Sequence, residues 1–306
     1  MTQTSHALTG VLPVFQTPYL ENGEIDADTL RREIDWLYEQ GADGLVMAMV
    51  SEILRLGEQE RNELAAMACR FSNDRGPVIV SVGAESTRIA VSFARHAADA
   101  GAAGLMAIPP VSIAPREDEL FSYYEAILKA TSLPVVIQDA SGYVGRPMTI
   151  EFQARLLELF GAEQVQFKPE ATPIGPRLSL LRDATHGKGK IFEGTGGISL
   201  VDSYRRGIVG TMPGADLIRG IVPLWQALQL GDDRRAYALS LPISSIVALQ
   251  NSLDAFLAIE KYLLVKQGVF RNTIVRGPVA YRLDPETQAE VDRLFHVLCR
   301  EIEESE

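Results

Sequence analysis

The sequence predicts a (β/α)8 barrel. Eight short apolar segments rich in β-branched residues recur along the first 213 residues of the 306-residue chain, and helical patterns separate them. Most of these segments are nearly continuous apolar runs, as expected of parallel strands that are covered on both faces. Eight such units within about 215 residues fit a barrel better than a doubly wound sheet. A dinucleotide-binding fold would also need a glycine fingerprint after its first strand, and segment 13–23 contains none.

The expected strands are short, and each is followed by a loop and a helical pattern. In chain order they are GVLPVF (10–15), DGLVMAM (43–49), PVIVSVG (77–83), AGLMAIPP (103–110), LPVVIQD (133–139), QVQFKPE (164–170), GKIFEG (189–194) and GIVGTMP (207–213).

Amphipathic stretches between the strands are the expected helices. Residues 26–40 and 87–100 are two examples, and Gly41 and Gly101 follow them in the position where glycine commonly ends a helix. The segments that begin at these glycines, GADGLVMAM and GAAGLMAIP, resemble each other. This internal similarity supports a repeating βα unit.

The last third of the chain is expected to be helical. Residues 215–306 are too apolar for a solvated tail, so we expect them to pack on the barrel and on other subunits. The expected organisation is therefore a barrel over residues 1–214 and a helical extension over 215–306, which together form a single structural unit.

Composition excludes several classes of function. The net charge of −11 argues against a nucleic-acid partner, which would require clustered Lys and Arg. The N-terminus shows no basic region followed by an apolar stretch, and no apolar run approaches the ~20 residues that cross a bilayer. Cys69 and Cys299 form no metal-binding spacing, and the four histidines are dispersed. We therefore expect a cytoplasmic protein with no metal, no cofactor and no membrane partner.

One lysine stands out. The chain has 23 arginines and six lysines, and only Lys168 falls at the C-terminal end of an expected strand, where barrels carry their reactive groups. Strand pleating places Gln166, Lys168 and Glu170 on one face, with Val165 and Phe167 on the other. Removal of water favours the neutral amine, which can attack a ketone to form a Schiff base. An ion pair between Lys168 and Glu170 is the equal alternative from these residues alone.

Five motifs extend this observation to the whole chain. They are QTPY (16–19), SEILRLGEQER (51–61), FKPE (167–170), FEGTGG (192–197) and GIVGTMP (207–213). With them the chain resembles the dihydrodipicolinate synthase and N-acetylneuraminate lyase family of class I aldolases and dehydratases. The resemblance implies that Lys168 forms a Schiff base with the keto group of a 2-oxo acid, and that the protein is a homotetramer.

Departures from the family pattern bear on the reaction. The usual Gly-Thr-Thr-Gly-Glu loop reads AMVSE here, so Met49 and Val50 replace both hydroxyls and Ser51 offers one a position later. Gln138 stands where the family's catalytic tyrosine belongs, and Val111 is nearest to a second expected tyrosine. These losses disfavour dihydrodipicolinate synthase activity.

The same losses favour elimination over carbon–carbon cleavage. Retro-aldol cleavage needs a base at the C4 hydroxyl, and the amide of Gln138 can only form hydrogen bonds. QDA on the fifth strand, FK-x-E on the sixth and the pair Ser51–Glu52 resemble the family branch that dehydrates 2-keto-3-deoxy sugar acids, such as 2-keto-3-deoxy-arabonate. We therefore hypothesise a dehydratase. A pyruvate-releasing aldolase and a non-catalytic barrel that binds a 2-oxo acid are the alternatives.

Three residues are assigned to catalysis and each has an alternative. Lys168 is the expected Schiff-base residue. Glu170 either tunes the amine and donates a proton to the leaving hydroxyl, or only pairs with Lys168. Glu52 either assists proton transfer or has a structural role beneath the site.

The remaining candidates would bind substrate. Ser51 is expected to bind a carboxylate or hydroxyl, or else to cap a helix, and Gln138 to hydrogen-bond a substrate hydroxyl. Asp139 and Tyr143 are loop candidates, with Arg146 close to the position of the family's carboxylate-binding arginine. The other three expected binding residues lie at the ends of the last two strands: Gly194, Thr195 and Thr211.

Overall fold

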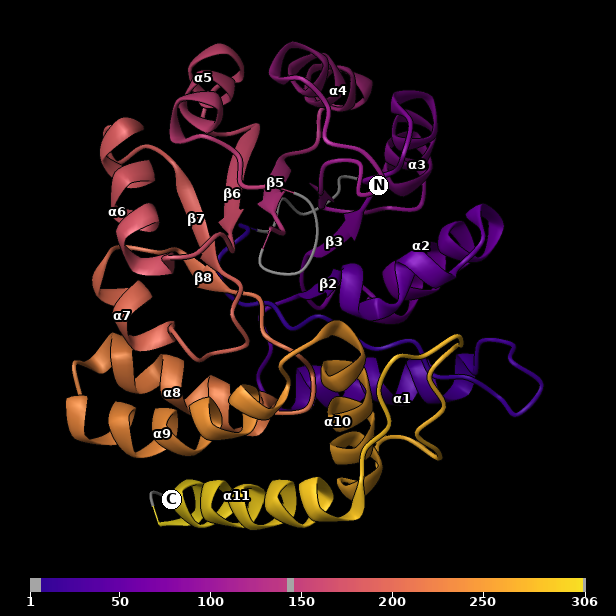
Figure 1. Cartoon of the computed structure of the whole chain (residues 1–306), viewed down its shortest axis with the longest axis vertical. Helices are drawn as coiled ribbons and strands as arrows, with labels where there is room; N and C mark the ends of the chain where they lie inside the picture. The colour runs from indigo at the N-terminus through magenta and orange to yellow at the C-terminus, as the bar shows by residue number, and fades with distance from the viewer. Residues whose placement is uncertain (1–6, 142–145, 305–306) are drawn as a thin grey trace.

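The computed structural model describes residues 7–141 and 146–304 and confirms the barrel (Figure 1). Eight parallel strands follow the order β1-β8-β7-β6-β5-β4-β3-β2. The ring closes between β1 and β2 through a bridge from Val14 to Val46. The strands are β1 Gly10–Val11, β2 Leu45–Met47, β3 Val78–Ser81, β4 Gly104–Ala107, β5 Val135–Asp139, β6 Val165–Pro169, β7 Lys190–Glu193 and β8 Gly210–Thr211.

Helices connect the strands and form the outer ring (Figure 1). The connecting elements are α1 Ala27–Glu39, the 3-10 turns η1 Met49–Ser51 and η2 Ile53–Arg55, α2 Glu58–Ser72, α3 Thr87–Asp99, α4 Glu117–Ala130, α5 Ile150–Phe160, α6 Ile174–Ala184 and α7 Leu200–Arg205. Asp26 shows how such a helix begins, because its carboxylate accepts the backbone N–H of Thr29 at 3.0 Å.

Four further helices follow β8. They are α8 Ile218–Leu230, α9 Asp233–Leu249, α10 Leu253–Lys266 and α11 Pro285–Glu303. Figure 1 shows α8, α9 and α11 stacked on one side of the barrel, with α10 beside α1. None of the described helices is long and apolar enough to cross a membrane.

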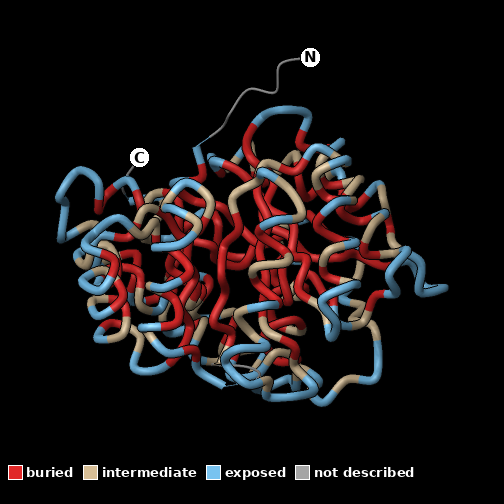
Figure 2. Tube along the Cα trace, turned by 90° about the horizontal axis from the view of Figure 1, so that it is seen from above, coloured by how far each residue is buried: buried red, intermediate tan, exposed pale blue. Residues whose placement is uncertain are grey.

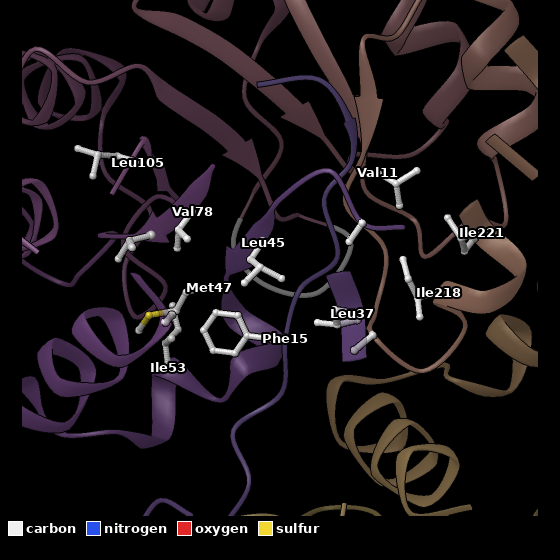
Figure 3. Close-up of a cluster of buried hydrophobic side chains, with 14 of the residues drawn as sticks. Val11, Phe15, Leu37, Leu45, Met47, Ile53, Val78, Leu105, Ile218 and Ile221 are labelled. Carbon is white, nitrogen blue, oxygen red and sulfur yellow. The ribbon is translucent and has the colours of Figure 1, made fainter. Parts of the chain in front are cut away.

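The strands separate two apolar layers. An outer cluster lies between strands and helices and includes Leu45, Met47 and Leu105, with Ile218 and Ile221 from α8 (Figure 3). An inner cluster fills the barrel with alternate residues of the same strands, among them Val46, Ile79, Met106, Val136 and Phe192. The buried residues accordingly gather at the centre of the molecule (Figure 2).

The alternation fixes the orientation of the sixth strand. Val165 and Phe167 belong to the outer cluster, as the pleating predicts. Gln166 and Lys168 therefore point to the barrel axis, above the apolar plug of the inner cluster.

Candidate active site

Lys168 lies at the C-terminal end of β6 and is only 4% exposed. Its register partner on β5 is Gln138, so the two side chains leave neighbouring strands at the same level. The Lys168 Nζ is 3.3 Å from Oε1 of Glu170. The ion pair weighed from the sequence is therefore present, and it places a carboxyl group beside the amine.

Glu170 contacts both the amine of Lys168 and the side-chain amide of Gln138. Its second oxygen, Oε2, accepts a hydrogen bond from Nε2 of Gln138 at 2.6 Å. Burial raises the pKa of Glu170, the Lys168 charge and the Gln138 hydrogen bond oppose that rise, and the negative charge of Glu193 adds to it. A carboxyl group with a raised pKa keeps a proton to higher pH than a free carboxyl group, so it can return a proton as well as take one.

One polar atom of this group has no partner. Oε1 of Gln138 is buried and forms no hydrogen bond with any described residue. An unpaired buried amide oxygen is unfavourable by about 1–3 kcal/mol. It therefore favours a ligand that donates a hydrogen bond at this point.

A pocket of about 30 Å³ opens beside these three side chains. Gly194 leaves space for them, because a Cβ at this position would overlap Cε of Lys168 and lie 2.8 Å from Oε1 of Glu170. The described residues that line the pocket are Val14, Ala48, Met49, Val50, Gln138, Lys168, Glu170, Gly194, Gly196, Met212, Pro213, Gly214 and Phe256. Phe256 belongs to α10, a segment in which none of the sequence motifs falls.

The loop after β2 holds its own polar side chains. The hydroxyl of Ser51 donates to the carbonyl of Phe15 at 2.6 Å and accepts the N–H of Ala48 at 3.2 Å. Ser51 is fully buried and does not belong to the residues that line the pocket. Its hydroxyl ties the loop to the segment after β1.

Glu52 lies behind the same loop. It adopts a left-handed backbone conformation, with φ of 59°. Its carboxylate forms an ion pair with the fully buried Lys261 of α10 and accepts the backbone N–H of Arg276 at 2.9 Å. Burial lowers the pKa of Lys261, and the Glu52 carboxylate opposes that change. In this geometry Glu52 anchors the loop to the C-terminal helices, which is the structural alternative considered from the sequence.

Asp139 accepts hydrogen bonds from two backbone groups that follow β5. Its two carboxylate oxygens accept the backbone N–H groups of Ser141 at 3.2 Å and Met148 at 3.0 Å, and Arg177 approaches to 3.7 Å. Tyr143 lies outside the described residues.

Thr195 and Thr211 both donate to Glu193, a residue that the sequence did not single out. The Thr211 hydroxyl lies 2.7 Å from Oε2 of Glu193, and Oε1 accepts the hydroxyl and the backbone N–H of Thr195. The Thr195 hydroxyl also accepts the N–H of Ser199 at 3.1 Å. Both threonines thus order the ends of β7 and β8 around one buried carboxylate.

A second buried group supports the opposite wall of the pocket. Gln16 donates its backbone N–H to Glu33 at 2.8 Å and its side-chain amide to Glu260. Burial raises the pKa of Glu33 and of Glu260 well above the ordinary range, and that of Asp216 to about 7. A Cβ on Gly214, which lines the pocket, would lie 2.8 Å from Glu260 and 2.9 Å from Asp216.

The described residues form no metal-binding site. Across residues 7–141 and 146–304, no group of three or more His, Cys, Asp or Glu side chains is placed to hold an ion.

A family model matches residues 7–296, and its description is the dihydrodipicolinate synthetase family. The chain belongs to this family. Its members are class I lyases and aldolases.

Relatives within the family differ in their named activities. The chain is 28% identical to an L-2-keto-3-deoxyarabonate dehydratase of Azospirillum brasilense, over 92% of both chains. It is also 28% identical to a 4-hydroxy-tetrahydrodipicolinate synthase of Bartonella bacilliformis, over 87% of this chain and 90% of that one.

Solved structures of the family share the fold. A dihydrodipicolinate synthase from Rhodopseudomonas palustris is 26% identical, with a TM-score of 0.84 over 95% of this chain and 97% of that chain. YagE from E. coli K12, solved in complex with pyruvate, has a TM-score of 0.87 at 23% identity, over 95% of this chain and 99% of the other.

Proposed function

We propose that this protein dehydrates a 2-keto-3-deoxy sugar acid of the pentonate or hexonate type through a Schiff base on Lys168. The observation that carries the proposal is the contact between Gln138 and Glu170 beside the amine. It puts a carboxyl group with a raised pKa next to the reactive nitrogen, and none of the described residues that line the pocket is a tyrosine. The named activity of the Azospirillum relative agrees with this choice.

The first half of the reaction forms an enamine. Glu170 takes a proton from the Lys168 ammonium, and the neutral amine attacks C2 of the 2-oxo acid. Glu170 then gives this proton to the departing hydroxyl of the adduct, so that water leaves, an iminium ion forms and Glu170 is a carboxylate again. The positive nitrogen makes the C3 hydrogens acidic. Glu170, 3.3 Å from Nζ, takes one C3 proton, and the electron pair of that bond forms the neutral enamine.

The second half expels the C4 hydroxyl. Glu170 returns its proton to the C4 oxygen, the C4–O bond breaks with its electron pair, and water leaves. The enamine electrons form the C3–C4 double bond and restore the iminium, and its hydrolysis frees Lys168. Gln138 offers its free Oε1 to a substrate hydroxyl, which orients the chain during both halves.

Borohydride trapping tests the proposal. The protein is incubated with pyruvate and, separately, with 2-keto-3-deoxy sugar acids, then reduced, weighed by mass spectrometry and mapped by peptide. We expect an adduct on Lys168 with both kinds of compound and none in Lys168→Ala. The absence of any adduct would contradict the Schiff base.

Product analysis separates the proposal from an aldolase. Dehydration of a 2-keto-3-deoxy pentonate gives water and a 5-hydroxy-2-oxo-3-enoic acid, which becomes a dioxo acid when a C5 proton moves to C3 and the resulting enol tautomerises to the aldehyde. Cleavage instead gives pyruvate and an aldehyde. NMR of the reaction mixture distinguishes the two. Pyruvate as the main product would favour the aldolase, and an adduct without turnover would favour a binding protein.

We also propose a homotetramer. Tyr237 and Leu241 are exposed apolar residues one turn apart on α9 and suit a contact with another copy. Light scattering of the purified protein would give the mass of four chains, and the mass of one chain would contradict the assembly.

A further inference from the structure

Glu193 is a buried carboxylate that the proposed reaction leaves unused. It ends β7, is 2% exposed and pairs in register with Thr211 of β8. Its hydrogen-bond donors are two threonine hydroxyls and one backbone N–H. Within the described part of the chain, no Lys, Arg or His side chain forms an ion pair with it.

Strand alternation places this carboxylate behind the pocket. Ile191 belongs to the outer apolar cluster and Phe192 to the inner one. Glu193 therefore leaves β7 on the side of Ile191, away from the barrel axis. The next residue, Gly194, lies directly against Lys168 and Glu170. The residue next to Glu193 in the sequence is therefore the one that packs against the acid–base pair.

The three neutral donors hold the carboxylate in one place. A salt bridge would cancel its charge, whereas hydrogen bonds from hydroxyl and amide groups stabilise the charge and leave it in the site. Its field acts on Glu170, whose pKa is raised first by burial and further by Glu193.

We infer that Glu193 is a positioning residue of the elimination, which keeps the proton taken from C3 on Glu170 until the C4 oxygen accepts it. The inference rests on the proposed function. In the enamine intermediate the nitrogen on Lys168 is neutral, so the cation that attracted the Glu170 carboxylate in the free enzyme is absent. The Glu193 charge persists at that stage, and it opposes loss of the proton from Glu170 to solvent.

Glu193→Gln removes the charge and keeps the size of the side chain. The amide can still accept from Thr195 and donate to the Thr211 hydroxyl, so we expect the fold to persist. Glu193→Asp is the matched control, because it shortens the side chain and keeps the charge.

The first readout is the pH profile of kcat for dehydration. We expect the alkaline limb, where Glu170 loses its proton, to move down by about one pH unit in Glu193→Gln, the scale of one nearby charge. A shift of one unit gives about a tenfold loss of kcat at pH values above the limb of the natural protein, and little loss at pH values below the limb of the variant. Glu193→Asp should keep the limb of the natural protein even where its turnover is lower. An unmoved limb in Glu193→Gln would overturn the inference and assign Glu193 a structural role.

The second readout is hydrogen exchange on pyruvate, a reaction in which no C4 hydroxyl is expelled. Pyruvate bound to Lys168 exchanges its methyl hydrogens with D2O through the enamine, and Glu170 is the base for that exchange. We expect the acid limb of the exchange rate, followed by NMR, to move to lower pH in Glu193→Gln and to stay in place in Glu193→Asp. If Glu193→Gln exchanges hydrogens and the acid limb of its rate stays at the pH of the natural protein, the inference is overturned and the proposed function is not. No exchange and no Lys168 adduct in the natural protein would overturn the proposed function, and the inference with it.

Discussion

Asp216 should make the protein less stable as the pH rises, and Asp216→Asn should abolish that loss. The side chain is 2% exposed and accepts a hydrogen bond from Nε2 of Gln250 at 3.1 Å. Burial raises its pKa from 3.8 to about 7, and burial together with the charge of Asp216 also raises the pKa of the neighbouring Glu260. The two carboxyl groups are coupled.

The sign follows from proton binding. Between about pH 4 and pH 7 the folded protein holds a proton on Asp216 that the unfolded chain has released, so the free energy of unfolding falls as the pH rises through this window. Below the window both states are protonated, and above it both are ionised and the loss is complete. One pKa unit is about 1.4 kcal/mol, so the two units from pH 5 to pH 7 give a loss of about 3 kcal/mol at most.

Urea unfolding at pH 5 and pH 8, at equal ionic strength and protein concentration, measures the effect. From pH 5 to pH 8, we expect the free energy of unfolding of Asp216→Asn to fall by up to about 3 kcal/mol less than that of the natural protein. Asparagine keeps the shape of the side chain and does not titrate. Asp74→Asn, at an exposed position, serves as the control and should give no such gain. Equal pH dependence of the natural protein and Asp216→Asn would refute the reasoning.

Three further predictions concern the site and its support. Gly194→Ala should slow formation of the pyruvate adduct at least tenfold, as measured by borohydride trapping over time, since the added methyl overlaps Cε of Lys168; an unchanged rate would show that the amine has room to move. Lys261→Met should lower the free energy of unfolding in urea by about 3–5 kcal/mol, because it leaves the Glu52 carboxylate buried without its cation, and adding Glu52→Gln should restore part of that loss. Gln138→Met should abolish any preference for 2-keto-3-deoxy acids over pyruvate in adduct formation, and a preference that survives would place hydroxyl recognition elsewhere.

The barrel and the lysine could be predicted because both depend on local pattern. Val165, Gln166, Phe167 and Lys168 alternate between apolar and polar, and that alternation alone decides which side chains face the axis. The position of a polar group at the end of a parallel strand then places it at the reactive end of the barrel.

The surroundings of the site could not be predicted because they depend on contacts between distant segments. Glu52 meets Lys261 across 209 positions of sequence, and Phe256 reaches the pocket from a helix beyond the barrel. The role of Glu193 could not be predicted either, because its strand position faces away from the axis and its partner Thr211 comes from another strand. No periodicity in the sequence records such pairings.

Gln138 suggests how a barrel of this family can change its reaction without disturbing its core. The residue is the next-to-last of β5, two positions beyond Val136, whose side chain belongs to the inner apolar cluster. An amide in place of a phenol at residue 138 therefore removes no apolar packing from the inner cluster. The polar atoms of a buried amide need hydrogen-bond partners. Glu170 satisfies Nε2, and Oε1 has no partner among the described residues. A substrate hydroxyl that donates to Oε1 removes an unfavourable term of about 1–3 kcal/mol, which pyruvate cannot do because it has no hydroxyl to donate. Under the proposed function, the same substitution withdraws the base for carbon–carbon cleavage and favours substrates that carry a hydroxyl to expel.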